Sequence, residues 1–230
     1  MALCAILFCV NFVSCEKEGG LTGIGQGKKI SKIVQQASDG KPEIAIYTFS
    51  YDKKGRLIEA TDNWENDLYT FYFDWSDCAI VSNYQTLTLK SGLVVESGEN
   101  TSYTYNDAGR LIQCEWPSNK CTIHWNDDKV VFVDDLDCGS TRFSYGSSCK
   151  NGYFPIIADN IIYTDIDLVL LMAHPEIVGI RTTQLPVSED DGKVLYSYEF
   201  DKDGYVAKII KEYTSGYNKG VIETWDITWE

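Results

Sequence analysis

A short turn unit that recurs along the chain constrains the fold more than any other feature of this sequence. The unit reads YDKKGRL at residues 51–57, YNDAGRL at 105–111 and, less closely, FDKDGYV at 200–206. Alternating aromatic and β-branched residues flank the first copies, and such residues favour strands. The Asp or Asn side chain can cap a tight turn, and the Gly supplies the positive φ that closes it. Each unit therefore predicts a β-hairpin with a short glycine-containing loop.

The charge balance excludes some classes of partner. The chain has 230 residues, of which 34 are acidic and 20 basic, so its formal net charge is −14. A chain this acidic is poorly suited to a phosphate backbone or an anionic membrane surface, and we expect no nucleic-acid partner. Aromatic residues make up 13% of the chain, which favours sheet over helix, and its length suits one sizeable β domain.

The first 28 residues have the composition of an export signal followed by a tether. Residues 2–14 are mostly apolar and uncharged, and a polar, glycine-rich segment begins directly after Cys15. This pattern predicts a signal peptide at 1–14. A Cys directly after a small residue resembles the lipobox of bacterial lipoproteins, which makes Cys15 the lipid attachment site and 15–28 an anchored, flexible tether. The resemblance implies a lipid-anchored protein of the bacterial cell envelope, on the periplasmic or surface face of the outer membrane.

The N-terminal pattern leaves two alternatives open. No Lys or Arg precedes the apolar run, which departs from the usual export signal. A cleaved peptide without lipid, or a buried first strand, would also explain the apolar run.

Residues 29–230 form a series of strand-length runs separated by turn signals. Runs this short and closely spaced favour an antiparallel meander over a parallel α/β arrangement. We expect about a dozen strands, and twist makes a sheet of that size curl, split or close. The sequence therefore predicts a mainly β domain in which a single antiparallel meander curls into a barrel or half-barrel.

One segment near 165–173 has a helical pattern instead. Ile166, Val169 and Leu170 fall at helical spacing, and Pro175 ends the run. Apolar residues cover this short helix nearly all round, which predicts that it is buried. We expect it against the concave side of the sheet or across one mouth.

A membrane-spanning barrel is the alternative to a soluble one. Membrane strands need about nine to eleven residues, and they carry an unbroken apolar outward face. Many runs in this chain are shorter, and Lys211 and Glu212 fall on opposite faces of one of them. We therefore expect a water-soluble, monomeric domain with an apolar interior, joined to the membrane through its lipid anchor only.

The turn units resemble the YD repeats of bacterial Rhs-type proteins. Together with the lipobox, the glycine-rich tether and one late helix, they are similar to a family of secreted Bacteroides-type lipoproteins without an assigned activity. The resemblance covers roughly residues 28–230, although Tyr205 and Val206 of the third unit stand where Arg and Leu are expected. It implies a porin-like β fold and lipid binding, for which some members of the family are named. It implies no catalytic residue.

Five cysteines remain once the signal peptide and the lipid-bearing Cys are set aside: Cys78, Cys114, Cys121, Cys138 and Cys149. An odd number cannot all pair within the chain. Cys114 and Cys121 could face each other across a hairpin, and an oxidising envelope permits disulfides. The alternative is that these residues are small buried hydrophobes. The pairing stays open, and no Cys-x-x-Cys spacing points to a metal.

The sequence lacks the common motifs for catalysis and metal binding. Neither His124 nor His174 is in a His-Glu-x-x-His pattern, and there is no Gly-x-Ser-x-Gly elbow or phosphate-binding glycine loop. The acidic run at 133–139 matches a calcium loop only in part, and we interpret it as a solvated turn. We expect a protein that is not an enzyme and that needs no metal and no cofactor.

A binding module is the function that these patterns favour. A curved sheet could hold a lipid, another apolar small molecule or a glycan, because aromatic side chains offer large contact areas. Trp64, Trp75 and Trp116 lie at or near strand ends and are the candidate ligand-binding residues, with packing in the core or rim as the alternative for each.

The second functional hypothesis is an assembly subunit that meets another envelope protein through a sheet edge or an aromatic patch. The two hypotheses differ in what they require of the structure. A pocket on the order of several hundred cubic ångströms favours the binding module. A filled interior beside an exposed apolar patch favours the assembly subunit.

Overall fold

The computed structural model of this protein describes residues 27–38, 45–64, 67–98, 100–135, 139–148, 166–179 and 184–230. The expected signal peptide, Cys15 and most of the expected tether lie outside these residues, as do Cys138 and Cys149. In the part of the chain that the structure describes, no helix is long and apolar enough to cross a membrane.

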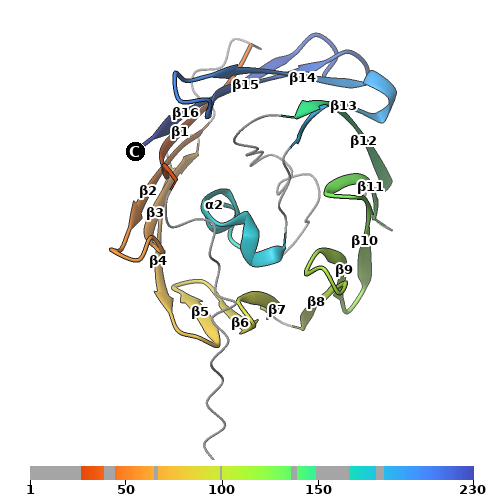
Figure 1. Cartoon of the computed structure of the whole chain (residues 1–230). Helices are drawn as coiled ribbons and strands as arrows, with labels where there is room; N and C mark the ends of the chain where they lie inside the picture. The colour runs from red at the N-terminus through yellow and green to blue at the C-terminus, as the bar shows by residue number, and fades with distance from the viewer. Residues whose placement is uncertain are drawn as a thin grey trace, which may run out of the picture.

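Within the described residues, sixteen antiparallel strands close into one barrel, in which strands adjacent in the chain are adjacent in the sheet (Figure 1). The strands are β1 (Ile30–Ala37), β2 (Ala45–Tyr51), β3 (Leu57–Trp64), β4 (Asp67–Trp75), β5 (Ala79–Ser82), β6 (Thr86–Lys90), β7 (Leu93–Ser97), β8 (Thr101–Tyr105), β9 (Leu111–Trp116), β10 (Asn119–Asn126), β11 (Lys129–Asp135), β12 (Gly139–Ser148), β13 (Gln184–Glu189), β14 (Val194–Phe200), β15 (Val206–Tyr213) and β16 (Ile222–Trp229). Pairing of β16 with β1 closes the barrel. The expected antiparallel meander is confirmed, with more strands than expected.

β13 is a strand that the sequence pattern does not predict. It contains Pro186, which has no N–H for a sheet ladder, and such residues are confined to edges and irregularities. Pro186 pairs with Tyr145 of β12 at a point where the register between the two strands shifts. The missing donor therefore falls at a break in the ladder.

Apolar side chains point into the barrel along each strand. On β2, Ala45, Tyr47 and Phe49 are at most 5% exposed, whereas Thr48 and Ser50, which follow Tyr47 and Phe49, are exposed. Successive residues of a strand point to opposite faces, so this alternation places one face in the barrel interior and the other outside.

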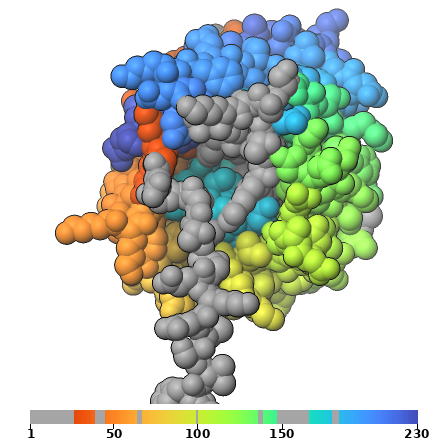
Figure 2. Space-filling model, in the orientation of Figure 1, coloured from red at the N-terminus to blue at the C-terminus, as the bar shows by residue number. Residues whose placement is uncertain are grey.

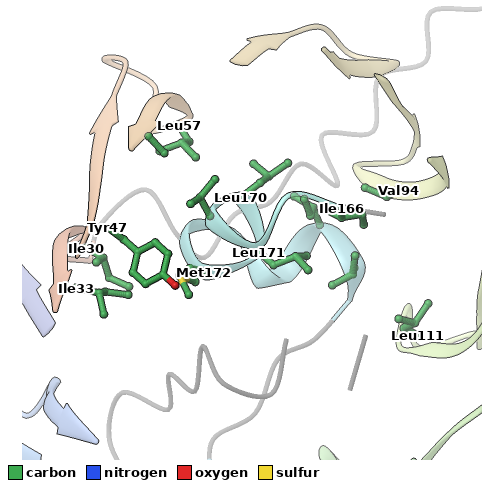
Figure 3. Close-up of a cluster of buried hydrophobic side chains, with 14 of the residues drawn as sticks. Ile30, Ile33, Tyr47, Leu57, Val94, Leu111, Ile166, Leu170, Leu171 and Met172 are labelled. Atoms are coloured by element: carbon green, nitrogen blue, oxygen red, sulfur yellow. The ribbon is translucent and has the colours of Figure 1, made fainter. Parts of the chain in front are cut away.

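The wall side chains of a barrel this wide cannot fill its interior, because barrels of about sixteen strands enclose a channel unless it is plugged. Here α2 (Leu168–Ala173) and the 3-10 turn η1 (Pro175–Val178) lie inside the barrel, and we call them the plug (Figure 1). Figure 2 looks into one mouth and shows plug atoms at the bottom of the hollow. Residues 169–172 of α2 are at most 1% exposed (Figure 3). The expected buried helix is therefore confirmed.

The three turn units fold into the same hairpin turn. In the first unit, Oδ1 of Asp52 accepts the backbone N–H groups of Lys54 and Arg56 at 2.8 and 3.0 Å. Asn106 and Asp201 accept the equivalent pairs of bonds in the other units, at 2.9 to 3.1 Å. The glycine of each unit has a φ between 72° and 84°, which confirms the expected positive φ.

All three turns lie at one end of the barrel, which we call the repeat end. They join β2 to β3, β8 to β9 and β14 to β15, and in an antiparallel meander every connection from an even to an odd strand falls at the same end. The described N-terminal residues and the C-terminus also meet there, because Lys29 and Glu230 exchange two backbone hydrogen bonds of 2.8 Å.

A ring of aromatic side chains reinforces the repeat end. For each unit, a Trp in the even-numbered strand that follows it (β4, β10 or β16) donates its Nε1–H to the carbonyl of the residue that ends the unit. These bonds are Trp75 to Leu57 (2.7 Å), Trp125 to Leu111 (2.6 Å) and Trp229 to Val206 (2.7 Å). Tyrosines make similar bonds from their hydroxyl groups elsewhere around the ring: Tyr105 to Val94, Tyr145 to Val130 and Tyr198 to Pro186. Aromatic side chains in the second half of the even strands thus bond to carbonyls at or near the starts of the odd strands.

The third unit departs from the sequence pattern but keeps its packing. In the second unit the guanidinium of Arg110 lies over Trp125, with its carbon 5.6 Å from the ring centroid. In the third unit Tyr205 takes the place of Arg, and its ring centroid is 5.0 Å from that of Trp229. A planar group packed on the Trp is therefore common to both units.

Candidate functional site

A pocket of about 360 Å³ opens at the repeat end, between the first turn unit and the plug. Its lining comes from the first turn, from the ends of β4 and β6 and from the start of η1. Its aromatic and apolar residues are Trp75, Leu89 and His174, and its charged residues include Lys54, Arg56 and Asp77. The pocket therefore offers both an apolar wall and a charged rim.

Trp75 is held in a fixed orientation on the pocket wall. Its Nε1–H is used in the bond to the Leu57 carbonyl. Its ring meets the ring of His174 edge to face, with centroids 5.2 Å apart and an interplanar angle of 72°. Trp75 can therefore offer a ligand its ring surface but not its N–H group.

His174 joins the plug to the start of β3 through both ring nitrogens. Its Nε2 lies 3.1 Å from the backbone nitrogen of Leu57, and its Nδ1 lies 2.7 Å from Oε1 of Glu176. A backbone N–H can only donate, so Nε2 is the acceptor and the ring proton is on Nδ1, which donates to Glu176. His174 and Glu176 are each 5% exposed. With both nitrogens engaged, His174 has no free position at which to act as a general base.

The charged rim contains two cations, Arg56, which is paired with Asp52, and Lys54, which is not in an ion pair within the described residues. Arg56 donates Nε–H to Oδ2 of Asp52 at 2.8 Å, and its Nη2 is 2.7 Å from the same oxygen. Partial burial opposes ionisation of Asp52, but its bonds with Arg56 and Lys54 prevail and lower the pKa of the carboxyl. Lys54 is exposed and makes no ion pair within the described residues. Lys54 is therefore available for an anionic group in the pocket.

The plug is attached to the wall at two further places. Near the start of α2, Oδ2 of Asp167 accepts the hydroxyl of Ser82 at 3.0 Å, and burial raises the pKa of the Asp167 carboxyl. After η1, Gly179 has a φ of 68° and lies so close to the second turn unit that a Cβ on it would overlap the carbonyl oxygen of Gly109. The first and second turn units thus both hold the plug.

The three candidate tryptophans are not brought together. Trp75 lines the pocket at the repeat end. Trp116 ends β9 and Trp64 ends β3, so both lie toward the opposite end of the barrel. Trp116 is half-buried and packs against the core, which agrees with the alternative of core or rim packing. The side chain of Trp64 lies outside the described part of the structure.

Cys114 and Cys121 face each other directly across β9 and β10. Both side chains are thiols and at most 1% exposed, and burial raises the pKa of the Cys114 thiol. The structure thus shows them as small buried side chains in a sheet. Cys78 is also a thiol, and it is exposed.

The described residues hold no group of three or more His, Cys, Asp or Glu that could bind a metal ion. In the acidic run at 133–139, Asp134 accepts a hydrogen bond from Ser140, and Asp135 accepts one from Asn119. Residues 136–138 lie outside the description.

Comparison with known proteins gives no match, either among protein families or among curated proteins. The resemblance to the Bacteroides-type lipoproteins therefore stays a prediction.

Several pocket residues could not be predicted from the sequence. His174 meets Leu57 across 117 positions of sequence, and no spacing signals that contact. The first turn unit was recognisable, but its pattern identified Arg56 and Lys54 only as turn residues. The one available signal was Trp75 at a strand end, which was among the candidates.

Proposed function

We propose that this protein is a lipid-anchored envelope protein whose barrel is a non-catalytic binding module for an amphiphile with an apolar body and an anionic head group. The pocket at the repeat end carries this proposal. Trp75 and Leu89 form the wall for the apolar body, and Lys54 at the rim meets the head group. Pockets for small ligands are mostly apolar with a few placed polar groups, and this pocket fits that description.

The state of the histidine supports a binding role over a catalytic one. General acid–base catalysis needs a titratable group within reach of the substrate and free to exchange a proton. His174 uses both nitrogens to hold the plug against β3. The hydrogen-bonded pair of His174 and Glu176 therefore serves to fix the shape of the pocket.

The position of Lys28 and Lys29 supports a ligand drawn from a membrane. Lys28 and Lys29 are attached at the repeat end, Lys28 by ion pairs of 2.8 and 2.6 Å to Asp201 and Asp203. About a dozen residues separate Cys15 from these lysines, and such a segment spans at most roughly 40 Å. A lipid on Cys15 would therefore hold the pocket mouth toward the bilayer.

Binding is tested with a fluorescent long-chain fatty acid, which has the proposed apolar body and anionic head. We expect saturable binding by the parent protein. In Trp75→Ala the affinity should fall at least about tenfold, because the variant removes the aromatic wall. Trp125→Ala is the matched control: it removes the equivalent clamp of the second unit, which does not line the pocket. Equal loss of binding in both variants, or no binding by the parent protein, would contradict the proposal.

The anchor is tested separately in cells. Globomycin blocks removal of a lipoprotein signal peptide, so the precursor should accumulate. Cys15→Ser should release or mislocalise the protein. Retention of the Cys15→Ser protein on the membrane would show that the anchor is wrong, whatever the result of the binding test.

A second candidate function, an assembly subunit, is favoured by an apolar patch on the outer surface. Leu68, Tyr72 and Val81, on β4 and β5, are 67%, 56% and 44% exposed. Leu68 and Tyr72 share the strand face opposite to the buried Phe73. Tyr72→Lys should abolish capture of an envelope partner by in-cell crosslinking and leave fatty-acid binding unchanged. If the purified protein is monomeric and no crosslink depends on Tyr72, the binding module is the better account.

A further inference from the structure

The pocket at the repeat end contains two opposite charges that the protein does not compensate. Its lining has four charged residues: Lys54, Arg56, Asp77 and Glu176. Arg56 is paired with Asp52, and Glu176 accepts the Nδ1–H of His174. Lys54 and Asp77 are exposed, and neither is in an ion pair within the described residues. A ligand in this pocket therefore meets one uncompensated charge of each sign.

Both charges are carried by turns whose backbones are fixed by hydrogen bonds. Lys54 lies in the first turn unit, where its backbone N–H donates to Oδ1 of Asp52 at 2.8 Å. Asp77 lies in the turn between β4 and β5. In that turn the hydroxyl of Ser76 donates to the carbonyl of Ala79 at 3.1 Å and accepts the N–H of the same residue at 3.0 Å. The backbone positions of Lys54 and Asp77 are therefore set before a ligand binds.

Trp75 connects the two turns and offers an aromatic surface. It ends β4, and its carbonyl oxygen lies 3.5 Å from Nη1 of Arg56 in the first turn unit. Its Nε1–H is used in the bond to Leu57, so a ligand meets the ring and not the N–H group. The face of a Trp ring attracts a cation more strongly than that of the other aromatic side chains. Trp75 and Asp77 are thus both suited to a positively charged group.

We propose that the head group of the ligand is zwitterionic, with its anionic group on Lys54 and an ammonium group between Asp77 and the Trp75 ring. This inference rests on the function proposed above, because it concerns the same pocket and the same amphiphile. A purely anionic head group would pair with Lys54 but would meet Asp77 as a like charge, whereas a zwitterion compensates both.

The size of the pocket narrows the class of lipid further. Pockets for small ligands have volumes of roughly 300–1,000 Å³. At about 360 Å³ this pocket is near the lower end of that range, which suits one acyl chain and not two. A lysophospholipid with an ethanolamine head group has the required chemistry.

The test compares two lysophospholipids with the same lauroyl chain, lysophosphatidylethanolamine and lysophosphatidylglycerol. Both carry one phosphodiester anion, and only the first has an ammonium group. Displacement of the fluorescent fatty acid from the purified protein measures each affinity, below the concentration at which the lipids form micelles. We expect the parent protein to bind the ethanolamine lipid about three- to tenfold more tightly, from an exposed ion pair and a cation–π contact together.

Two substitutions test the two charges separately. Asp77→Asn should weaken binding of the ethanolamine lipid about three- to fivefold, and should leave binding of the glycerol lipid unchanged or slightly tighter. Lys54→Met should weaken binding of both lipids about threefold, because both have the phosphate. Asp74→Asn and Lys53→Met are the matched controls, since these residues are exposed and do not line the pocket. The controls should bind both lipids as the parent does. All four side chains are exposed, so the Tm should not change.

The outcomes separate this inference from the function on which it rests. Affinity of the parent protein for the ethanolamine lipid that is equal to or weaker than its affinity for the glycerol lipid would overturn the zwitterionic head group. So would an Asp77→Asn variant that binds the ethanolamine lipid as the parent does, or that loses affinity equally for both lipids. In these cases fatty-acid binding that depends on Trp75 would leave the proposed function in place. If neither the lysolipids nor the fatty acid binds, the proposed function is wrong and this inference is wrong with it.

Discussion

The first and third turn units have the same backbone turn but bind different segments of the chain. In the first unit, the N–H of Leu57 donates to His174, so the turn holds the plug. In the third unit, Asp201 and Asp203 hold Lys28, so the turn fixes the N-terminal segment. Each unit buries its last residue completely and is secured by a Trp.

The repeated residues and the segments packed against them have different roles. The Asp or Asn, the Gly and the clamping Trp fix a rigid turn at three places on one rim. The pocket forms at the first turn, where the plug contributes His174 and Glu176. Whether a turn at the repeat end forms part of a pocket therefore depends on the segment that packs against it and not on the repeated residues.

The largest expected effect comes from breaking the contact between the plug and the second unit. In Gly179→Ala, the new Cβ overlaps the Gly109 carbonyl oxygen at a positive φ, and we expect a loss of about 4 kcal/mol in unfolding free energy. The matched variant Gly216→Ala has a φ of 77° and open space around it, so it should lose only about 1 kcal/mol. Urea unfolding measures both. Equal losses would mean that the plug contact contributes nothing.

The next effect tests the contact of the plug with the first unit. His174→Phe leaves the Leu57 N–H and the buried Glu176 carboxylate without a partner, and we expect a loss of about 3 kcal/mol. His124 is exposed, so His124→Phe should change stability by less than about 0.5 kcal/mol. Fatty-acid binding should also weaken in His174→Phe. Stability equal to that of the control variant would mean that the contact of His174 with Leu57 and Glu176 does not stabilise the fold.

A smaller effect should be shared by the first and third units. Gly55→Val and Gly204→Val place a β-branched residue at φ values of 83° and 84°, and we expect a loss of about 2 kcal/mol in each case. The losses should be comparable because the turn is the same, and the only added contact at Gly55 is with the flexible end of the Lys29 side chain, which can move away. An unchanged melting temperature in Gly55→Val would contradict the hairpin interpretation of the repeat.

The sequence predicted the repeated turns because their information is local. Asp52, Gly55 and Leu57 lie within one turn, and their chemistry alone selects a hairpin. The buried helix was predictable for the same reason, since its own side chains are apolar on nearly every face. Closure of the barrel was only one of the options left open, because pairing of β1 with β16 joins residues about 190 positions apart, such as Ile33 and Ile227.

The candidate site was less accessible because its contacts are distant in sequence. Trp75 was identified as a residue of interest, but no pattern in the sequence connected it with its partner His174. Asp77 gave no signal, since it is one of many acids in the sequence and only the fold places it in one pocket with Lys54. Strand β13 was missed because Pro186 argues against a strand, and only the register shift beside β12 accommodates it.

The smallest expected effect tests the third unit alone. Hydrogen bonding from Lys28, followed by that from the Tyr205 and Asp203 backbone, lowers the pKa of Asp201 to about 2. A lowered folded-state pKa means that this carboxylate contributes stability above its ordinary pKa near 4, and that the contribution is lost as the pH falls toward 2. Lys28→Met should raise the pKa of Asp201, but not to its ordinary value, because the backbone bonds remain. The pKa of Asp52 should stay where it is, since Arg56 of its own turn holds it. A carboxyl-detected NMR titration measures both groups in one experiment. If the pKa of Asp52 changes together with that of Asp201, the two turns are coupled through the repeat end. The first and third units would then not be independent.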